Sequence, residues 1–217
     1  MNNSKLEVFL IVLPIFIGSL TLHELAHGYV AYRLGDPTAK LMGRLSLNPI
    51  VHLDPLGSLM FVASYWAGGF LFGWARPVPV DPSNLRGGPQ RGMSLVGIAG
   101  PITNFLLALV FGAILGHVSL AYGSTEQNVI VYGMYVNIVL GVFNLLPIPP
   151  LDGSRIIAGF MDRRTYVAWS QLDQYGMIIL LVCFFVLRGP FTTLLQSSTT
   201  DVSTVISNIV GGTPFTL

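Results

Sequence analysis

Residues 6–34 read LEVFLIVLPIFIGSLTLHELAHGYVAYRL, and this stretch decides the fold. Residues 8–22 contain no ionisable side chain, and then His23, Glu24 and His27 arrive within five positions. As one helix the stretch would be about 43 Å long, which exceeds the ~30 Å hydrocarbon core of a bilayer. It therefore predicts a membrane-spanning helix that carries ionisable groups toward its C-terminal end. Such groups are costly at membrane depth and mostly functional.

The pattern H-E-x-x-H within this helix predicts a metal site. His23 and His27 share one helix face, so their imidazoles can hold one zinc ion, and Glu24 can accept a proton from a water on the same metal. The alternative is a set of partnered polar residues where the helix leaves the membrane. Catalytic zinc needs a third protein ligand, and the remaining candidates are Asp152 and His52. His52 would otherwise be an interfacial residue or a gating, fourth ligand, and we leave it out of the ligand set.

The composition is that of an integral membrane protein. Of the 217 residues, 52% are hydrophobic and only 10% are charged, against about 25% charged in soluble domains. The mean hydropathy is +0.67. A net charge of +1 gives no indication of nucleic acid binding, and the single cysteine excludes an intrachain disulfide. We predict one membrane-embedded domain over residues 1–188 and a C-terminal tail over residues 189–217.

Apolar segments along the chain predict an all-α polytopic fold in the lipid bilayer. Clear spans are expected at residues 6–34, 93–118, 129–146 and 172–187. Short edge strands are expected at residues 39–49 and 74–80, the first from its alternating leucines. Between them, residues 55–73 are long enough to span, but their glycines fit a re-entrant segment equally well.

Three blocks of the sequence resemble the site-2 proteases, zinc metalloproteases that cut within the membrane. The blocks are HELAH at residues 23–27, GIAGPITN at 97–104 and NLLPIPPLDG at 144–153. The resemblance implies a three-helix metalloprotease core plus an extra helix, of the compact prokaryotic type. It implies that one zinc ion is bound by His23, His27 and Asp152, with Glu24 as general base. It also implies that Asn144, together with Asn104, hydrogen-bonds the substrate or the developing oxyanion.

Charge and geometry together predict the topology. His27 and Asp152 lie near or beyond the C-terminal ends of their helices and must meet at one zinc, so those helices should run parallel with one net crossing between them. If residues 55–73 re-enter, nine of the eleven Lys and Arg residues fall on one side; if they span, only seven do. Because Lys and Arg concentrate on the cytoplasmic side, we predict re-entry, four spans and a zinc site toward the cytoplasm of a prokaryotic inner membrane.

The sequence thus predicts an intramembrane zinc endopeptidase acting on a transmembrane helix of a membrane protein substrate. Two alternatives are a non-proteolytic binding protein on the same scaffold and a transporter with an incidental zinc site. The presence of Glu24 disfavours the binding protein, because binding needs no general base.

Overall fold

Three long helices form the centre of the molecule. The computed structural model describes residues 4–67, 72–186 and 188–210. Within these residues, the helices long and apolar enough to cross a membrane are α1 (Lys5–Arg33), α4 (Pro89–His117) and α5 (Thr125–Leu145). The spans expected at 6–34, 93–118 and 129–146 are therefore confirmed as helices, and the chain is an all-α membrane protein.

Local sequence explains where these helices begin. Ser4 and Glu7 form a capping box at the start of α1, in which each side chain accepts a hydrogen bond from the other residue's backbone N–H. Pro89 occupies the first turn of α4, where a missing N–H costs nothing. Ser124 caps α5 by accepting from the N–H of Gln127.

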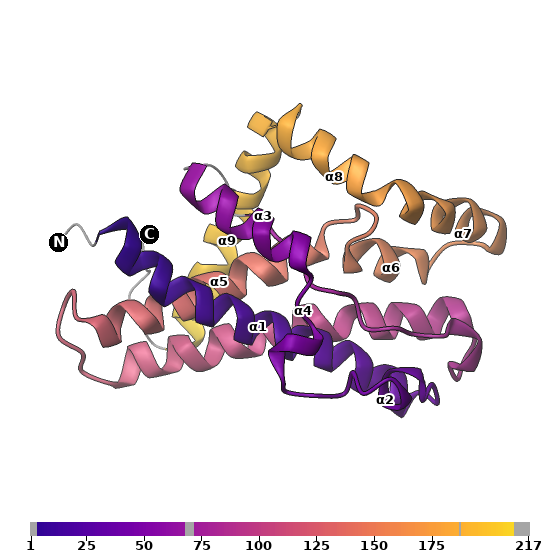
Figure 1. Ribbon diagram of the computed structural model, residues 1–217, viewed down its shortest axis with the longest axis horizontal. Helices are drawn as coiled ribbons and strands as arrows, with labels where there is room; N and C mark the ends of the chain where they lie inside the picture. Colours follow the sequence, from indigo (N-terminus) through magenta and orange to yellow (C-terminus); the bar gives the residue numbers. More distant parts are fainter. Residues whose placement is uncertain (1–3, 68–71, 187, 211–217) are drawn as a thin grey trace.

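The three helices pack side by side, with α1 and α5 running in the same direction and α4 against them (Figure 1). Glycines let α5 approach α4 closely. A Cβ at Gly133 would lie 2.7 Å from the ring of Phe111, and one at Gly141 would lie 2.7 Å from the ring of Phe105. The parallel course of α1 and α5 brings their C-terminal ends to the same end of the bundle.

The described residues on either side of the segment 55–73 lie close together, while residues 68–71 lie outside the described part of the chain. The segment begins as α3 (Pro55–Ala67), whose 13 residues extend only about 20 Å. The ring of Phe61 on α3 stacks on Phe16 of α1 at a centroid distance of 4.1 Å. The two ends of the segment meet, because Leu53 pairs with Ala75 in an isolated antiparallel bridge.

The prediction of edge strands is wrong: within the described residues, neither 39–49 nor 74–80 forms a strand. Instead of a strand at 39–49, the chain forms the short helix α2 (Thr38–Leu41), a turn at Gly43 with φ +67°, and the 3-10 helix η1 (Pro49–Val51). Residues 74–80 form no helix or strand and make only the one bridge, from Ala75 to Leu53. Pro77 and Pro79 lack an N–H group, so this segment cannot continue a ladder.

Buried Asp36 ties the turn after α1 to a second loop. Its carboxylate accepts hydrogen bonds from the N–H of Thr38 (3.1 Å), the N–H of Asp81 (2.8 Å) and the amide of Asn84 (3.1 Å). Asn84 ends the 3-10 helix η2 (Pro82–Asn84). Burial alone would raise the pKa of Asp36, but the hydrogen bond from the Thr38 hydroxyl, together with those from the N–H of Asp81, the Asn84 amide and the N–H of Thr38, outweighs it and lowers the pKa below its usual value.

Residues 152–185 form shorter helices than expected. After α6 (Asp152–Ala158) and α7 (Arg163–Ser170), the expected span 172–187 divides into the 3-10 helix η3 (Gln171–Tyr175) and α8 (Gly176–Phe185). The 10 residues of α8 extend about 15 Å, half of the hydrocarbon core. A fourth long span is thus absent from the described residues.

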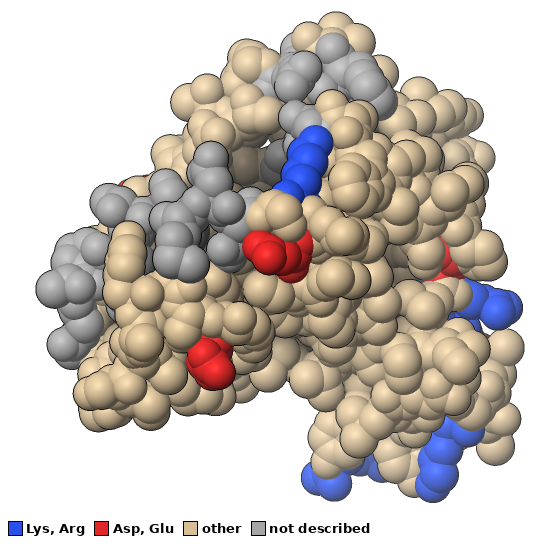
Figure 2. Space-filling view, turned by 60° about the vertical axis from the view of Figure 1, so that its left-hand side comes forward, with Lys and Arg blue, Asp and Glu red and all other residues tan. Residues whose placement is uncertain are grey.

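The last helix, α9 (Arg188–Val210), covers much of the segment expected to be a tail. Its Phe191, Leu195 and Ile206 are buried in a core cluster with Met134 and Ile138 of α5. The outer surface is mostly uncharged, and on the face shown in Figure 2 the Lys and Arg side chains gather mainly toward the lower right.

Candidate metal centre

His23 and His27 lie one turn apart on α1, and their rings meet inside the bundle. Their Nε2 atoms are 3.0 Å apart, and both residues are at most 5% exposed. The apolar stretch that precedes them places them near the C-terminal end of the helix, as the sequence predicts.

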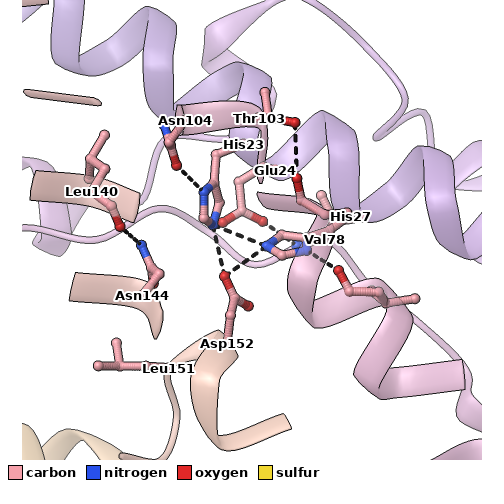
Figure 3. Close-up of polar contacts among 12 residues, drawn as sticks. His23, Glu24, His27, Val78, Thr103, Asn104, Leu140, Asn144, Leu151 and Asp152 are labelled. Atoms are coloured by element: carbon pink, nitrogen blue, oxygen red, sulfur yellow. Dashed lines mark hydrogen bonds and ion pairs between the residues drawn. The ribbon is translucent and has the colours of Figure 1, made fainter. Parts of the chain in front are cut away.

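Asp152 lies 125 positions after His27 in the sequence, and it reaches the same point from a different helix. Residues 147–150 contain three prolines, so α5 ends at Leu145 and Asp152 opens α6 beside the two imidazoles. Its Oδ2 lies 3.1 Å from the Nε2 atoms of both His23 and His27 (Figure 3). Among the described residues these three form a group whose ligand atoms all lie within 4.8 Å of one another.

The outer nitrogens of the two imidazoles show that this group fits a cation. The Nδ1 of His27 lies 2.7 Å from the backbone oxygen of Val96, and the Nδ1 of His23 lies 2.6 Å from Oδ1 of Asn104. A carbonyl oxygen only accepts, so each Nδ1 carries a proton, and in the neutral imidazole each Nε2 then presents a lone pair. Two lone pairs and a carboxylate oxygen then converge, and a metal ion would neutralise their mutual repulsion.

Gly100 of α4 makes room for the two rings. A Cβ at this position would lie 2.5 Å from both Cε1 of His23 and Nε2 of His27. Small residues such as those at 97–100 let helices pack closely, but this property alone does not indicate that Gly100 faces the two imidazoles. The additional signal is spacing, because Gly100 lies one turn before Asn104 and therefore on the same face of α4.

Glu24 points to the same cavity and is held by residues 74–80, which we call the strap. The N–H of Val78 donates to Oε2 of Glu24 at 3.0 Å. The strap is itself held by Arg44, whose Nη2 donates to the backbone oxygen of Arg76 at 2.6 Å. One carboxylate oxygen of Glu24 is therefore anchored, while the residue still lines the cavity.

The cavity between the strap and the metal centre has a volume of about 330 Å³. Asn144 lies in its wall and donates one amide hydrogen to Leu140 of its own helix at 3.0 Å. A second cavity of about 300 Å³ lies between α1, α3 and α5 and is lined by apolar and tyrosine side chains. Phe72, Gly73 and Leu140 line both cavities, so the two adjoin.

The other two histidines lie outside the group of three. His52 is 1% exposed, and its Nε2 lies 2.8 Å from the backbone oxygen of Ser46. It lies just before residues 55–73, which we call the α3 segment. His117 is exposed at the end of α4. Leaving His52 out of the predicted ligand set agrees with this placement.

Comparison with known proteins gives the family. A sequence model described as Peptidase family M50 matches residues 115–188. YwhC of Bacillus subtilis is 43% identical over 185 residues, which cover 81% of this chain and 80% of YwhC. The chain belongs to peptidase family M50, the site-2 proteases.

A second relative agrees with this assignment. Rip2 of Mycolicibacterium smegmatis is 31% identical over 181 residues, which cover 82% of this chain and 68% of Rip2. The printed name of each relative is "Putative zinc metalloprotease", and these names together with membership of family M50 support a zinc metalloprotease with zinc as its cofactor. No solved structure matches the chain significantly.

Proposed function

We propose that this M50 chain is an intramembrane endopeptidase that hydrolyses a peptide bond in or near a transmembrane helix of a membrane protein. The observation that carries the proposal is the meeting of His23, His27 and Asp152 beside Glu24, on helices apolar enough to lie in a bilayer. We infer that these three residues hold one zinc ion.

The remaining groups of the cavity divide the chemistry between them. When bound, zinc supplies a Lewis acid that activates water and polarises a carbonyl. Glu24 accepts the proton of the attacking water and returns it to the leaving nitrogen. Asn144 has a second amide hydrogen beyond the one given to Leu140, and this hydrogen stabilises the developing oxyanion. Asn104 was predicted to share that role, but its amide faces His23, which favours a positioning role.

The strap and the α3 segment are proposed to control substrate entry. A helical substrate must become extended before it can be cut, and the strap runs beside the cavity from Trp74 to Val80. The adjoining apolar cavity would hold the part of the substrate that stays in the membrane. Release of the strap from Arg44 and Glu24 would widen the path.

The structure also bears on the proposed topology. The backbone bridge between Leu53 and Ala75 supports a segment that enters and leaves at one membrane face. The single crossing by α4 then returns α5 to the direction of α1, so His27 and Asp152 reach the same depth. We propose a multi-pass protein of the prokaryotic inner membrane with its zinc site toward the cytoplasm, where the positive charges would lie.

The test compares cells that carry the unsubstituted enzyme with cells that carry Glu24→Gln. Proteomics of the membrane fraction should reveal fragments that end inside or beside a transmembrane segment and are missing with Glu24→Gln. Purified protein should make the same cuts and lose the activity with a chelator. If both forms give identical fragments, the protease proposal fails, and metal binding without cleavage would favour the non-proteolytic alternative.

A further inference from the structure

A line of hydrogen bonds leads from the metal centre through the interior of the three-helix core. The Oδ1 of Asn104 contacts His23, and the Nδ2 of Asn104 donates to Oδ1 of Asn137 at 3.0 Å. The Nδ2 of Asn137 donates to Oγ of Ser19 at 2.9 Å and to the backbone oxygen of Gly133 at 2.8 Å. Both asparagines are fully buried, and Ser19 is 5% exposed. This line, which we call the relay, joins α1, α4 and α5.

The backbone oxygen of Gly133 fixes the direction of every hydrogen bond in the relay. A carbonyl oxygen can only accept, so Asn137 must turn its NH₂ group toward Gly133. The side-chain oxygen of Asn137 then faces Asn104. Asn104 must therefore donate to it from its NH₂ group, which leaves the oxygen of Asn104 facing His23. That oxygen requires a proton on Nδ1 of His23, and the Nε2 lone pair is left for the metal.

We propose that Asn137 is a positioning residue for zinc binding, acting through Asn104 on the tautomer and orientation of His23. The inference rests on the proposed zinc ligands. Removing a group that orients a metal-binding histidine through its second ring nitrogen typically lowers the metal affinity about 10- to 100-fold. A buried asparagine that only joined two helices would stabilise the fold without acting on one histidine.

His27 provides an internal comparison. Its Nδ1 donates directly to the backbone oxygen of Val96, so no side chain of the relay supports it. Loss of the relay should therefore loosen His23 and leave His27 in place. A general weakening of the bundle would instead affect both rings, since they lie on successive turns of α1.

The test uses the full chain purified in detergent, loaded with zinc and labelled with ¹⁵N-histidine. Asn137→Leu keeps the side chain's approximate shape and removes its hydrogen bonds. The zinc Kd, measured by chelator competition, should rise about 10- to 100-fold. By NMR, hydrogen exchange at Nδ1 should accelerate for His23 and not for His27. The control is Thr103→Val, since Thr103 donates only to Ala99 of its own helix and its loss should change neither value.

A double variant separates positioning from folding. Asn137→Leu alone leaves the buried Asn104 amide without its partner, which can impair folding. The double variant Asn104→Leu with Asn137→Leu removes that unpaired amide, so its zinc Kd can be measured even if Asn137→Leu alone folds poorly. If the two residues act in one line, the double variant binds zinc as weakly as Asn104→Leu alone. Independent, additive losses would overturn the relay, as would an unchanged zinc Kd in Asn137→Leu or equal acceleration at both histidines. If the unsubstituted chain bound no zinc, the proposed function itself would fail.

Discussion

Replacing Gly100 with alanine should disable the metal centre while leaving the fold largely intact. The added Cβ would lie 2.5 Å from atoms of both His23 and His27, whereas ordinary contact begins at 3.4 Å. Either the rings or α4 must therefore move by about 1 Å in an interior that is closely packed. The rings are held from behind by Val96 and Asn104, both on α4 itself, so moving the helix would carry their hydrogen-bond partners away.

The expected magnitudes follow from these contacts. Inserting one methyl group into a packed interior costs about 1–3 kcal/mol, and the better helix propensity of alanine offsets about 1 kcal/mol of that. The change in thermal stability should therefore be small. A displacement of about 1 Å in a catalytic constellation can cost 10²-fold in rate, so kcat/KM should fall by about that factor. The zinc Kd should rise by roughly tenfold or more, in the range seen when the surroundings of metal ligands are disturbed.

The assay combines chelator competition for zinc with cleavage of a substrate found by the proteomic comparison. Gly18→Ala is the matched control, because Gly18 lies on α1 with nothing within 4 Å of an added Cβ. It should keep full zinc affinity and activity. Full zinc affinity and activity in Gly100→Ala would refute the close approach of α4 to the two imidazoles.

Four further results are expected. Glu24→Gln should retain zinc, measured as metal content, and lose cleavage, because it removes a base and not a ligand. Asn144→Ala should lower kcat by about 10²–10³ with normal zinc content, as for a lost oxyanion donor, whereas a change in KM alone would indicate substrate docking. Since folding lowers the pKa of Asp36, its carboxylate stabilises the fold fully above the ordinary pKa of about 4 and progressively less as the pH falls through the lower folded value. The difference in melting temperature between the unsubstituted chain and Asp36→Asn should therefore be largest near neutral pH and narrow in acid; a difference independent of pH would contradict this. Cysteines placed at Ser46 and Ser83, after replacement of the native cysteine, should react with an impermeant reagent from the same, cytoplasmic face, and labelling from opposite faces would contradict re-entry.

The sequence predicted the parts of the site that depend on local spacing. The pair His23 and His27 follows from helix periodicity alone, and the break at the prolines before Asp152 indicates where a ligand from a second element can enter. The three long spans were equally predictable, because apolar length is a sequence property. These features need no knowledge of how the helices are rotated against one another.

Features that depend on tertiary contacts were missed or wrong. Alternating leucines at 39–49 suggested a strand, but the hydrogen bond from Thr38 to Asp36 starts a helical turn there instead. The span expected at 172–187 is interrupted, although its composition is apolar. Nothing in the sequence distinguishes Asn137 from any other polar residue in a membrane span. Its spacing of four from Gly133 and Gly141 places all three on the face of α5 that meets α4, yet its partners depend on the helix packing.

The two imidazoles are supported in different ways, and this difference has a consequence for how the site tolerates change. The Nδ1 of His27 is held by backbone, so no single side-chain substitution removes its partner. The Nδ1 of His23 is held by two asparagines in series, whose orientation is set by the backbone oxygen of Gly133 on a third helix. Zinc affinity should therefore be adjustable through the His23 side, and it should also respond to movement of α5 relative to α4. A substrate that displaces α5 on entering the adjoining apolar cavity between α1, α3 and α5 would act on the metal through the same line of hydrogen bonds.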